Sequence, residues 1–258
     1  MASSVGLALA VTPAARAAST VRYVALGDSY SSGLGAGNYI SSSGSCDRSN
    51  NAYPEQWADA NAPASFVSVA CAGATTADVI STQVSALSAS TTLVSITIGG
   101  NDAGFSGVME TCLLGSTRSC LGAVSDAESF VASQLPANLD NALQAIRTHA
   151  PNAKIVLLGY PDLYDLSTSG SCIGLSTKDR TALNGGADAI DGALAAAAAR
   201  NGDTFADVRP GFAGHEICDS GSWLNSVDWL DLGASYHPTA AGQADGYLPA
   251  FTAAAAAG

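Results

Sequence analysis

The chain has 258 residues, of which 47% are hydrophobic and only 12% charged, and its formal net charge at pH 7 is −12. The high apolar fraction excludes a chain that charge keeps disordered, and the length suits one large domain or two small ones. Only 10 Lys and Arg stand against 22 Asp and Glu, which excludes the basic face of a nucleic-acid binder and disfavours binding to anionic membranes.

The first 18 residues have the features of an export signal. Residues 5–11 form a short apolar run, and Ala15 and Ala17 have the A-x-A spacing of a cleavage site. The run is shorter than the roughly 20 residues that span a bilayer. We therefore expect residues 1–18 to be a signal peptide, residues 19–258 to be the domain, and the protein to be secreted. The basic segment of a signal peptide is missing, which leaves open a start codon upstream; a plain Ala-rich terminus is the alternative.

Five short β-branched runs recur with helical stretches between them. Most of the runs are nearly continuous in apolar character, which is typical of parallel strands buried on both faces. In chain order we predict strand 21–26, helix 54–60, strand 66–70, helix 76–88, strand 93–98, a helix from residue 125, strand 154–159, helix 178–200, strand 204–208 and helix 238–251. This alternation predicts an α/β fold with a parallel sheet, and no linker divides the chain into two domains.

Local signals set several boundaries in these predictions. Ser125 and Glu128 have the spacing of a capping box, which predicts a helix start there. Pro136 predicts a break or kink, and Pro238 suits the first turn of the last helix. Long insertions follow strand ends, where open α/β sheets build their sites: residues 31–52, 105–124 and 161–177.

The chain has six cysteines, an even number that suggests three disulfides. Disulfides persist in oxidising compartments, so this number is consistent with an exported protein. None lies in a C-x-x-C zinc spacing. Six cysteines allow about 15 pairings, which sequence alone does not separate. Neighbour pairing is the simplest of them: Cys46–Cys71, Cys112–Cys120 and Cys172–Cys218.

A serine follows directly after the first predicted strand, in Gly27-Asp28-Ser29-Tyr30. At the carboxyl edge of the sheet its hydroxyl can project into the crevice where such sheets bind ligands. A G-x-S-x-G elbow is excluded, because Ser31 stands where the second glycine is required. Taken alone, the segment is more typical of a turn or a helix cap.

Polar groups also follow the second and third predicted strands. Asn101 comes after two glycines, and its amide can donate a hydrogen bond into the same crevice, as an oxyanion hole requires. Gly73 could offer a backbone N–H at the same edge. Taken alone, Asn101 is better explained by an Asn-Asp turn, and Gly73 is at least as well explained as a simple strand-to-helix glycine.

Among three histidines, His237 is the candidate base. His149 stands at a helix end facing water and His215 in a loop near Cys218, so both are interpreted as structural. His237 opens the last predicted helix. Scattered histidines and paired cysteines leave no ligand set for a metal, and no phosphate-binding GxxxxGK[ST] motif occurs, so we expect no metal and no cofactor.

Together these residues resemble the SGNH hydrolase family, also called GDSL-like lipases and esterases, in its secreted actinomycete branch with three disulfides. The match runs in order from about residue 22 to residue 250. The matching blocks are Gly27-Asp28-Ser29-Tyr30 (Tyr where the family name has Leu), Gly73, Gly99-Gly100-Asn101-Asp102 and His237-Pro238.

The resemblance implies a flavodoxin-like three-layer α/β/α sandwich with a five-stranded parallel sheet. It also implies that Ser29 is the nucleophile and His237 the general base. The Ser29 N–H, the Gly73 N–H and the Asn101 side chain would form the oxyanion hole.

One departure concerns the third member of a catalytic triad. Most of the family has Asp three residues before the histidine, where this chain has Ala234. Likeness to members with a dyad implies that the backbone carbonyl of Ser235 orients His237, with Asp231 as the rival. A carbonyl fixes the ring's tautomer but stabilises the imidazolium less than a carboxylate does. With an ordinary pKa of roughly 6.5, a neutral His237 base predicts that activity falls below that pH.

We therefore expect a secreted, monomeric serine ester hydrolase acting on acylglycerols, phospholipids or small acyl esters. A carbohydrate acetylesterase and an inactive binding module are the alternatives. Apolar side chains of the second insertion could line an acyl pocket or pack on the disulfide loop: Phe105, Val108, Met109, Leu113, Leu114 and Leu121.

Overall fold

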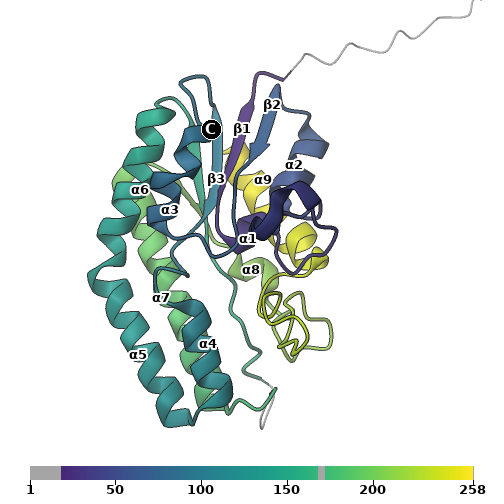
Figure 1. The fold of residues 1–258 in the computed structure, drawn as a ribbon, viewed down its shortest axis with the longest axis vertical. Coiled ribbons are helices and arrows are strands. Elements are labelled where there is room, and N and C mark those ends of the chain that lie inside the picture. The colour runs from purple at the N-terminus through teal and green to yellow at the C-terminus, as the bar shows by residue number, and fades with distance from the viewer. Residues whose placement is uncertain (1–18, 168–171, 258) are drawn as a thin grey trace, which may run out of the picture.

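The computed structural model describes residues 19–167 and 172–257 (Figure 1). The expected signal peptide, residues 1–18, lies outside the described residues. Within the described part, no helix has the length and apolar character needed to cross a membrane.

The centre of the molecule is a five-stranded parallel sheet with strand order β2-β1-β3-β4-β5. This is the flavodoxin-like order that the resemblance implies. All five predicted strands are confirmed within two residues at each end: β1 (Arg22–Gly27), β2 (Ser65–Ser68), β3 (Leu93–Thr97), β4 (Lys154–Leu158) and β5 (Thr204–Ala206). The central strand β3 is buried along its whole length, whereas β2 at the edge is half exposed.

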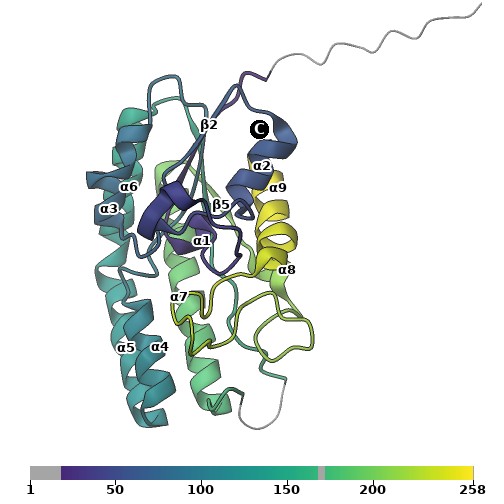
Figure 2. The same cartoon turned by 45° about the vertical axis from the view of Figure 1, so that its right-hand side comes forward.

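Helices cover both faces of this sheet and complete the predicted three-layer sandwich. Figure 2 shows α3 (Thr76–Ser81), α5 (Thr117–Ser133) and α6 (Leu135–His149) on one side, with α2 (Tyr53–Asn61) and α9 (Leu248–Ala256) on the other. The long α7 (Thr177–Asn201) packs against α5 and α6, and the short α8 (Arg209–Phe212) follows β5. In Figure 1 the strands lie in the upper half of the molecule and end near its middle, above α4 (Phe105–Leu114) and the lower ends of α5 and α7.

Two predicted features of the second insertion are wrong. Residues 105–124 are not a loop but α4 followed by the first half of α5. The cap of α5 is Ser116, whose side chain accepts from the Ser119 N–H, so the capping-box spacing at Ser125 falls inside the helix. The break predicted at Pro136 is confirmed, because α5 ends at Ser133 and Pro136 lies in the first turn of α6.

The last predicted helix begins later than expected. Pro238 is not in a helical turn but pairs with Leu224 in an isolated antiparallel bridge. The Thr239 hydroxyl accepts from the Gly242 N–H at 3.2 Å, and a π-helical segment, η3 (Gly242–Tyr247), leads into α9. The predicted helix 76–88 divides similarly into α3 and the 3₁₀ helix η2 (Gln83–Ala86).

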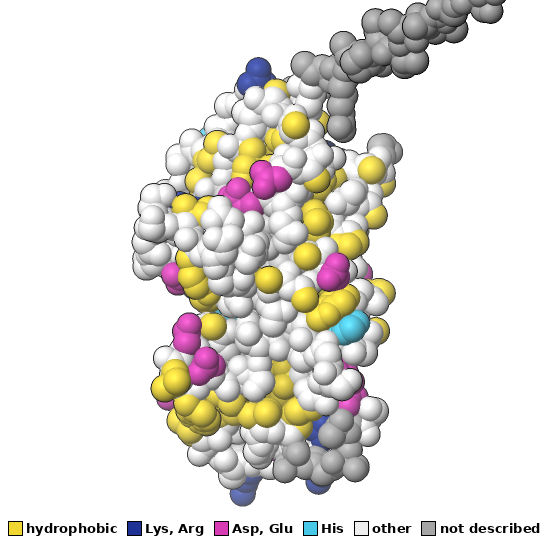
Figure 3. All heavy atoms as spheres, turned by 90° about the vertical axis from the view of Figure 1, so that its right-hand side faces the viewer, with side chains coloured by type: hydrophobic (Ala, Val, Ile, Leu, Met, Phe, Trp, Pro, Cys, Tyr) yellow, Lys and Arg dark blue, Asp and Glu magenta, His cyan; other side chains and the backbone are white. Residues whose placement is uncertain are grey.

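Three disulfides connect neighbouring cysteines along the chain, as the simplest pairing predicts: Cys46–Cys71, Cys112–Cys120 and Cys172–Cys218. The face shown in Figure 3 is largely uncharged, with scattered acidic groups and few basic ones.

Candidate active site

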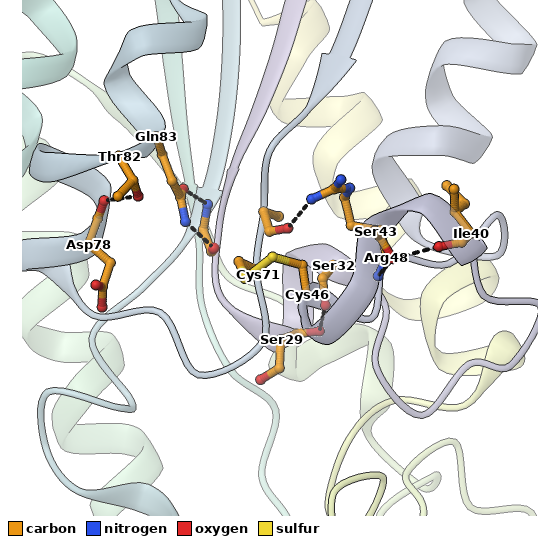
Figure 4. Close-up of a disulfide and its surroundings, with 12 residues drawn as sticks. Ser29, Ser32, Ile40, Ser43, Cys46, Arg48, Cys71, Asp78, Thr82 and Gln83 are labelled. Atoms are coloured by element: carbon orange, nitrogen blue, oxygen red, sulfur yellow. Dashed lines mark hydrogen bonds between the residues drawn. A yellow bond between two sulfur atoms is a disulfide. The ribbon is translucent and has the colours of Figure 1, made fainter.

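Ser29 is the first residue of the short helix α1 (Ser29–Ser32), which follows β1 directly. Gly27 makes this turn possible: its φ is +120°, and a Cβ there would lie 2.4 Å from the Thr97 carbonyl oxygen. The Gln83 amide pairs with both the N–H and the carbonyl of Gly27, at 2.7 and 2.9 Å (Figure 4). Close packing against Thr97 and the hydrogen bonds to Gln83 therefore hold the end of β1 in place, which fixes the position of Ser29.

The structure brings Ser29 and His237 together from positions 208 residues apart, with 2.7 Å between Ser29 Oγ and His237 Nε2. On the other side of the ring, Nδ1 lies 2.9 Å from the Ser235 carbonyl oxygen. Because a carbonyl only accepts, this contact selects the tautomer with hydrogen on Nδ1. Nε2 is then left free to take the proton of Ser29.

The backbone before His237 is held in an uncommon conformation. Tyr236 has φ of +66°, in the left-handed region that non-glycine residues seldom adopt. Three hydrogen bonds hold it: Tyr30 Oη donates to the Tyr236 carbonyl at 2.7 Å, and the main chain of Asn225 pairs with the Tyr236 N–H and the His237 carbonyl at 2.8 and 2.9 Å. Such conformations gather at functional sites, where surrounding contacts over-determine them. Here this turn is what aims the Ser235 carbonyl at the imidazole.

Asp231 is the other candidate for orienting the His237 ring, but its side chain makes a different hydrogen bond. Its carboxylate accepts from the Ala234 N–H at 3.2 Å, within the same loop. Of the two candidates, the Ser235 carbonyl is thus the group that touches the ring.

Burial changes the expected titration of the base. His237 is only 8% exposed, and this burial lowers its pKa from 6.5 to about 4, against a smaller opposing effect of the Ser235 carbonyl. Burial therefore moves the expected loss of activity from about pH 6.5 down toward about pH 4, the range in which the buried imidazole gains its proton.

The candidate oxyanion groups lie on one groove. Ser29, Gly73, Asn101 and His237 all line it. Gly73 has φ of +80°, with nothing within 4 Å of where a Cβ would stand. Asn101 Nδ2 donates to the Ala74 carbonyl at 3.0 Å, and this hydrogen bond connects the loop after β3 to the loop that holds Gly73. An amide NH₂ has two hydrogens, so the second remains for an oxyanion.

A disulfide holds the Gly73 loop beside Ser29. The Cys46–Cys71 disulfide joins the end of the 3₁₀ helix η1 (Ser41–Cys46) to the loop after β2, in the surroundings of Ser29 that Figure 4 shows. The Ala72 N–H also donates to the Cys46 carbonyl at 3.1 Å, and the Cys71 N–H to the Gly27 carbonyl at 3.0 Å.

A buried polar network beneath Ser29 was not predicted as part of the site. The Asp28 carboxylate accepts from the Tyr30 N–H at 3.0 Å, from Thr97 Oγ1 at 2.6 Å and from Tyr160 Oη. Burial raises the pKa of Asp28 to about 6. Tyr160 Oη in turn accepts from the Gly100 N–H at 3.3 Å. The available signal was position, because Asp28 and Tyr160 both follow strand ends.

An apolar cavity opens at Ser29 and runs between the helices. Among its described lining residues, only Asp28 and Glu128 carry carboxylates. The hydrophobic lining comes from three helices: Phe105, Val108 and Met109 of α4, Val124 and Val131 of α5, and Leu183 and Ile190 of α7.

The predicted acyl-pocket residues divide between this cavity and the groove outside it. Phe105 and Met109 line both, whereas Leu113 and Leu114 line only the groove. Leu121 lines neither and is 39% exposed.

The other two histidines lie in structural contacts. His149 Nδ1 is 2.9 Å from the Ala145 carbonyl on α6. His215 stacks on Trp223, with ring centroids 3.7 Å apart.

Comparisons with known proteins agree with this arrangement. Residues 25–244 match the model of the GDSL-like lipase/acylhydrolase family. A Streptomyces coelicolor protein named Lipase 1 is 54% identical over 246 residues, covering 95% of this chain and 91% of that protein.

Two solved structures are also similar across most of both chains. Phospholipase A1 from Streptomyces albidoflavus superposes with a TM-score of 0.88 at 52% identity, covering 91% of this chain and 99% of that one. An extracellular lipase from Streptomyces rimosus superposes with a TM-score of 0.88 at 50% identity, with the same coverage. The chain belongs to the GDSL-like lipase/acylhydrolase family and is a carboxylic ester hydrolase.

Proposed function

We propose that this protein is a secreted lipid ester hydrolase that works through an acyl-enzyme on Ser29. The observation that carries the proposal is the 2.7 Å contact between Ser29 and His237 at the mouth of an apolar cavity. The similar proteins named lipase and phospholipase A1 support a lipid substrate. Three disulfides support export, with residues 1–18 as the signal peptide, and we propose a monomer that does not bind nucleic acid.

The first half of the reaction forms the acyl-enzyme. Ser29 Oγ bonds to the ester carbonyl carbon while its proton passes to His237 Nε2. The Ser29 and Gly73 N–H groups and the Asn101 amide donate to the oxyanion. When the intermediate collapses, the carbon–oxygen bond to the alcohol breaks, and His237 returns the proton to the leaving oxygen.

The second half releases the acid. Water gives a proton to His237 Nε2 and bonds to the acyl carbon, and the proton then returns to Ser29 as the ester bond to Ser29 breaks. During both halves the imidazolium has a carbonyl partner, Ser235, rather than a carboxylate. Burial makes this cation costly, so its stabilisation depends on that carbonyl and on the transient negative charge of the oxyanion.

The cavity supports a medium or long acyl chain. An apolar lining favours hydrocarbon by about 0.8 kcal/mol for each buried CH₂ group. An acetyl group offers this apolar lining a single methyl group, so the lining favours a longer acyl chain over the acetylesterase alternative.

The proposal is tested with p-nitrophenyl esters from C2 to C16, followed by phosphatidylcholine and triacylglycerol, using the protein and its Ser29→Ala variant. We expect a medium or long acyl optimum that the variant loses. A sharp C2 optimum would favour the acetylesterase. Equal activity in both proteins would remove Ser29 as the nucleophile, and no activity in either would favour the binding module.

A further inference from the structure

Large apolar side chains stand in water around the groove that holds Ser29 and His237. On the loop before His237, Trp229 is 64% exposed, Leu230 99% and Leu232 61%. Leu114, at the end of α4, is 67% exposed and lines the same groove as Trp229 and Leu232. We call these four residues the docking rim. Clustered apolar exposure of this kind marks an interaction site in a soluble protein.

The loop's own polar groups hold the docking rim in this arrangement. The Asp228 carboxylate accepts from the Leu230 N–H at 2.8 Å, and the Ser235 hydroxyl accepts from the Asp228 N–H at 2.9 Å. Asp231 accepts from the Ala234 N–H. These polar side chains accept hydrogen bonds from the backbone N–H groups of the loop, while the apolar side chains between them face solvent. The exposure is therefore built into a hydrogen-bonded loop.

Charge around the docking rim selects among lipid surfaces. Asp228 and Asp231 are exposed on the loop, and Glu110 is exposed on the opposite wall of the groove. Among the described residues that line this groove, none is Lys or Arg. An anionic lipid surface would be repelled, whereas a zwitterionic one would not. Trp229 also suits such a surface, because indole has an apolar body and a polar N–H.

We propose that the docking rim inserts into the surface of a zwitterionic lipid layer and so places the Ser29 groove against its substrate. This inference rests on the proposed function and adds the surface through which the enzyme reaches lipid. Continuity between the docking rim and the groove means that an ester drawn out of the layer would meet Ser29 without crossing water.

Binding is measured with the Ser29→Ala protein, which removes hydrolysis from the readout. Phosphatidylcholine vesicles should shift the emission of Trp229 to the blue, since Trp57 is buried and Trp223 half-buried. Leu230→Ser, at a side chain that lines neither cavity, should weaken vesicle partition about tenfold or more, the scale of one buried leucine. The matched control is Ile80→Ser, an exposed apolar residue of α3 that is 40% exposed, and it should leave partition unchanged.

The active protein provides an independent readout. Leu230→Ser should leave hydrolysis of a soluble butyrate ester unchanged and lower hydrolysis of vesicle phosphatidylcholine. Vesicle binding without phosphatidylcholine hydrolysis by the active protein would support the docking rim and refute the lipid substrate. Normal partition of Leu230→Ser, or equally strong binding to phosphatidylglycerol vesicles, would overturn the docking proposal. So would a protein dimer in sedimentation that Leu230→Ser dissociates, because the docking rim would then be a contact between copies.

Discussion

Tyr30→Phe removes one oxygen atom and tests how the histidine is positioned. The Tyr30 hydroxyl donates to the Tyr236 carbonyl at 2.7 Å and so holds the peptide whose φ is +66°. The ring of Tyr30 packs edge-on against Tyr160 at a centroid distance of 5.0 Å, and phenylalanine keeps that packing. The substitution therefore isolates the hydrogen bond from the packing.

The expected loss of activity follows from the free energies of the carbonyl and the backbone turn that the Tyr30 hydroxyl holds in place. A buried carbonyl without its donor costs about 1–3 kcal/mol, and a left-handed non-glycine residue stores a similar amount. Relaxing this turn would swing the Ser235 carbonyl away from His237 in most molecules. We expect kcat to fall about tenfold and KM to change little, because the ring of Tyr30 still lines the acyl cavity.

Tyr247→Phe is the matched control. Its hydroxyl is also buried and also donates to a backbone carbonyl, but that carbonyl belongs to Gly159 after β4, at 2.8 Å, and not to the turn before His237. Both variants should lower Tm by a few degrees. Steady-state kinetics on a soluble ester, with Tm measured alongside, separates the two effects. An equal change of kcat in both variants would refute positioning by Tyr30.

Three further predictions concern the reacting groups and one concerns the cavity. Asn101→Ala should lower kcat by about 10²–10³ with little change in KM, and a change in KM alone would make Asn101 a binding residue. Asp231→Ala should keep most of its turnover in the same assay, whereas a loss of about 10⁴-fold would restore a carboxylate triad. Since His237 must be neutral and burial lowers its pKa to about 4, kcat/KM should fall only as the pH drops toward 4. A kcat/KM that falls to half its maximum near pH 6.5 would contradict the burial argument. The pH profile of Asp28→Asn separates any contribution of Asp28, whose pKa burial raises to about 6. Gly186→Leu should shorten the preferred acyl chain, because a Cβ there already lies 3.7 Å from Val124 across the cavity wall; an unchanged chain-length profile would exclude this cavity as the acyl site.

The sheet and the positions along its edge were predictable because both depend on local pattern. Continuous apolar runs mark strands buried on both faces, and parallel strands bring their carboxyl ends to one edge. Ser29, Gly73 and Asn101 each follow a strand of this parallel sheet, so their meeting in one groove follows from topology. Neighbour pairing of the cysteines agreed with the structure, but sequence alone did not select it, and the paired cysteines lie 25, 8 and 46 residues apart.

Other features depend on contacts between distant residues, which pattern does not reveal. The Asp28–Tyr160 hydrogen bond spans 132 residues, and the low pKa of His237 comes from burial by several elements at once. Local signals also misled. The spacing at Ser125 imitates a helix start because α5 begins earlier at Ser116, and Pro238 is used in a bridge that positions the histidine loop.

The most direct test of the account is covalent labelling by a long-chain p-nitrophenyl phosphonate, with the modified peptide identified by mass spectrometry. The account predicts one adduct on Ser29, formed quickly by the native protein and by Ser106→Ala, which removes another serine hydroxyl from the groove. Ser29→Ala should form none, and His237→Ala should form it far more slowly. An adduct on any other residue, or labelling that survives Ser29→Ala, would contradict the assignment of Ser29 as the nucleophile.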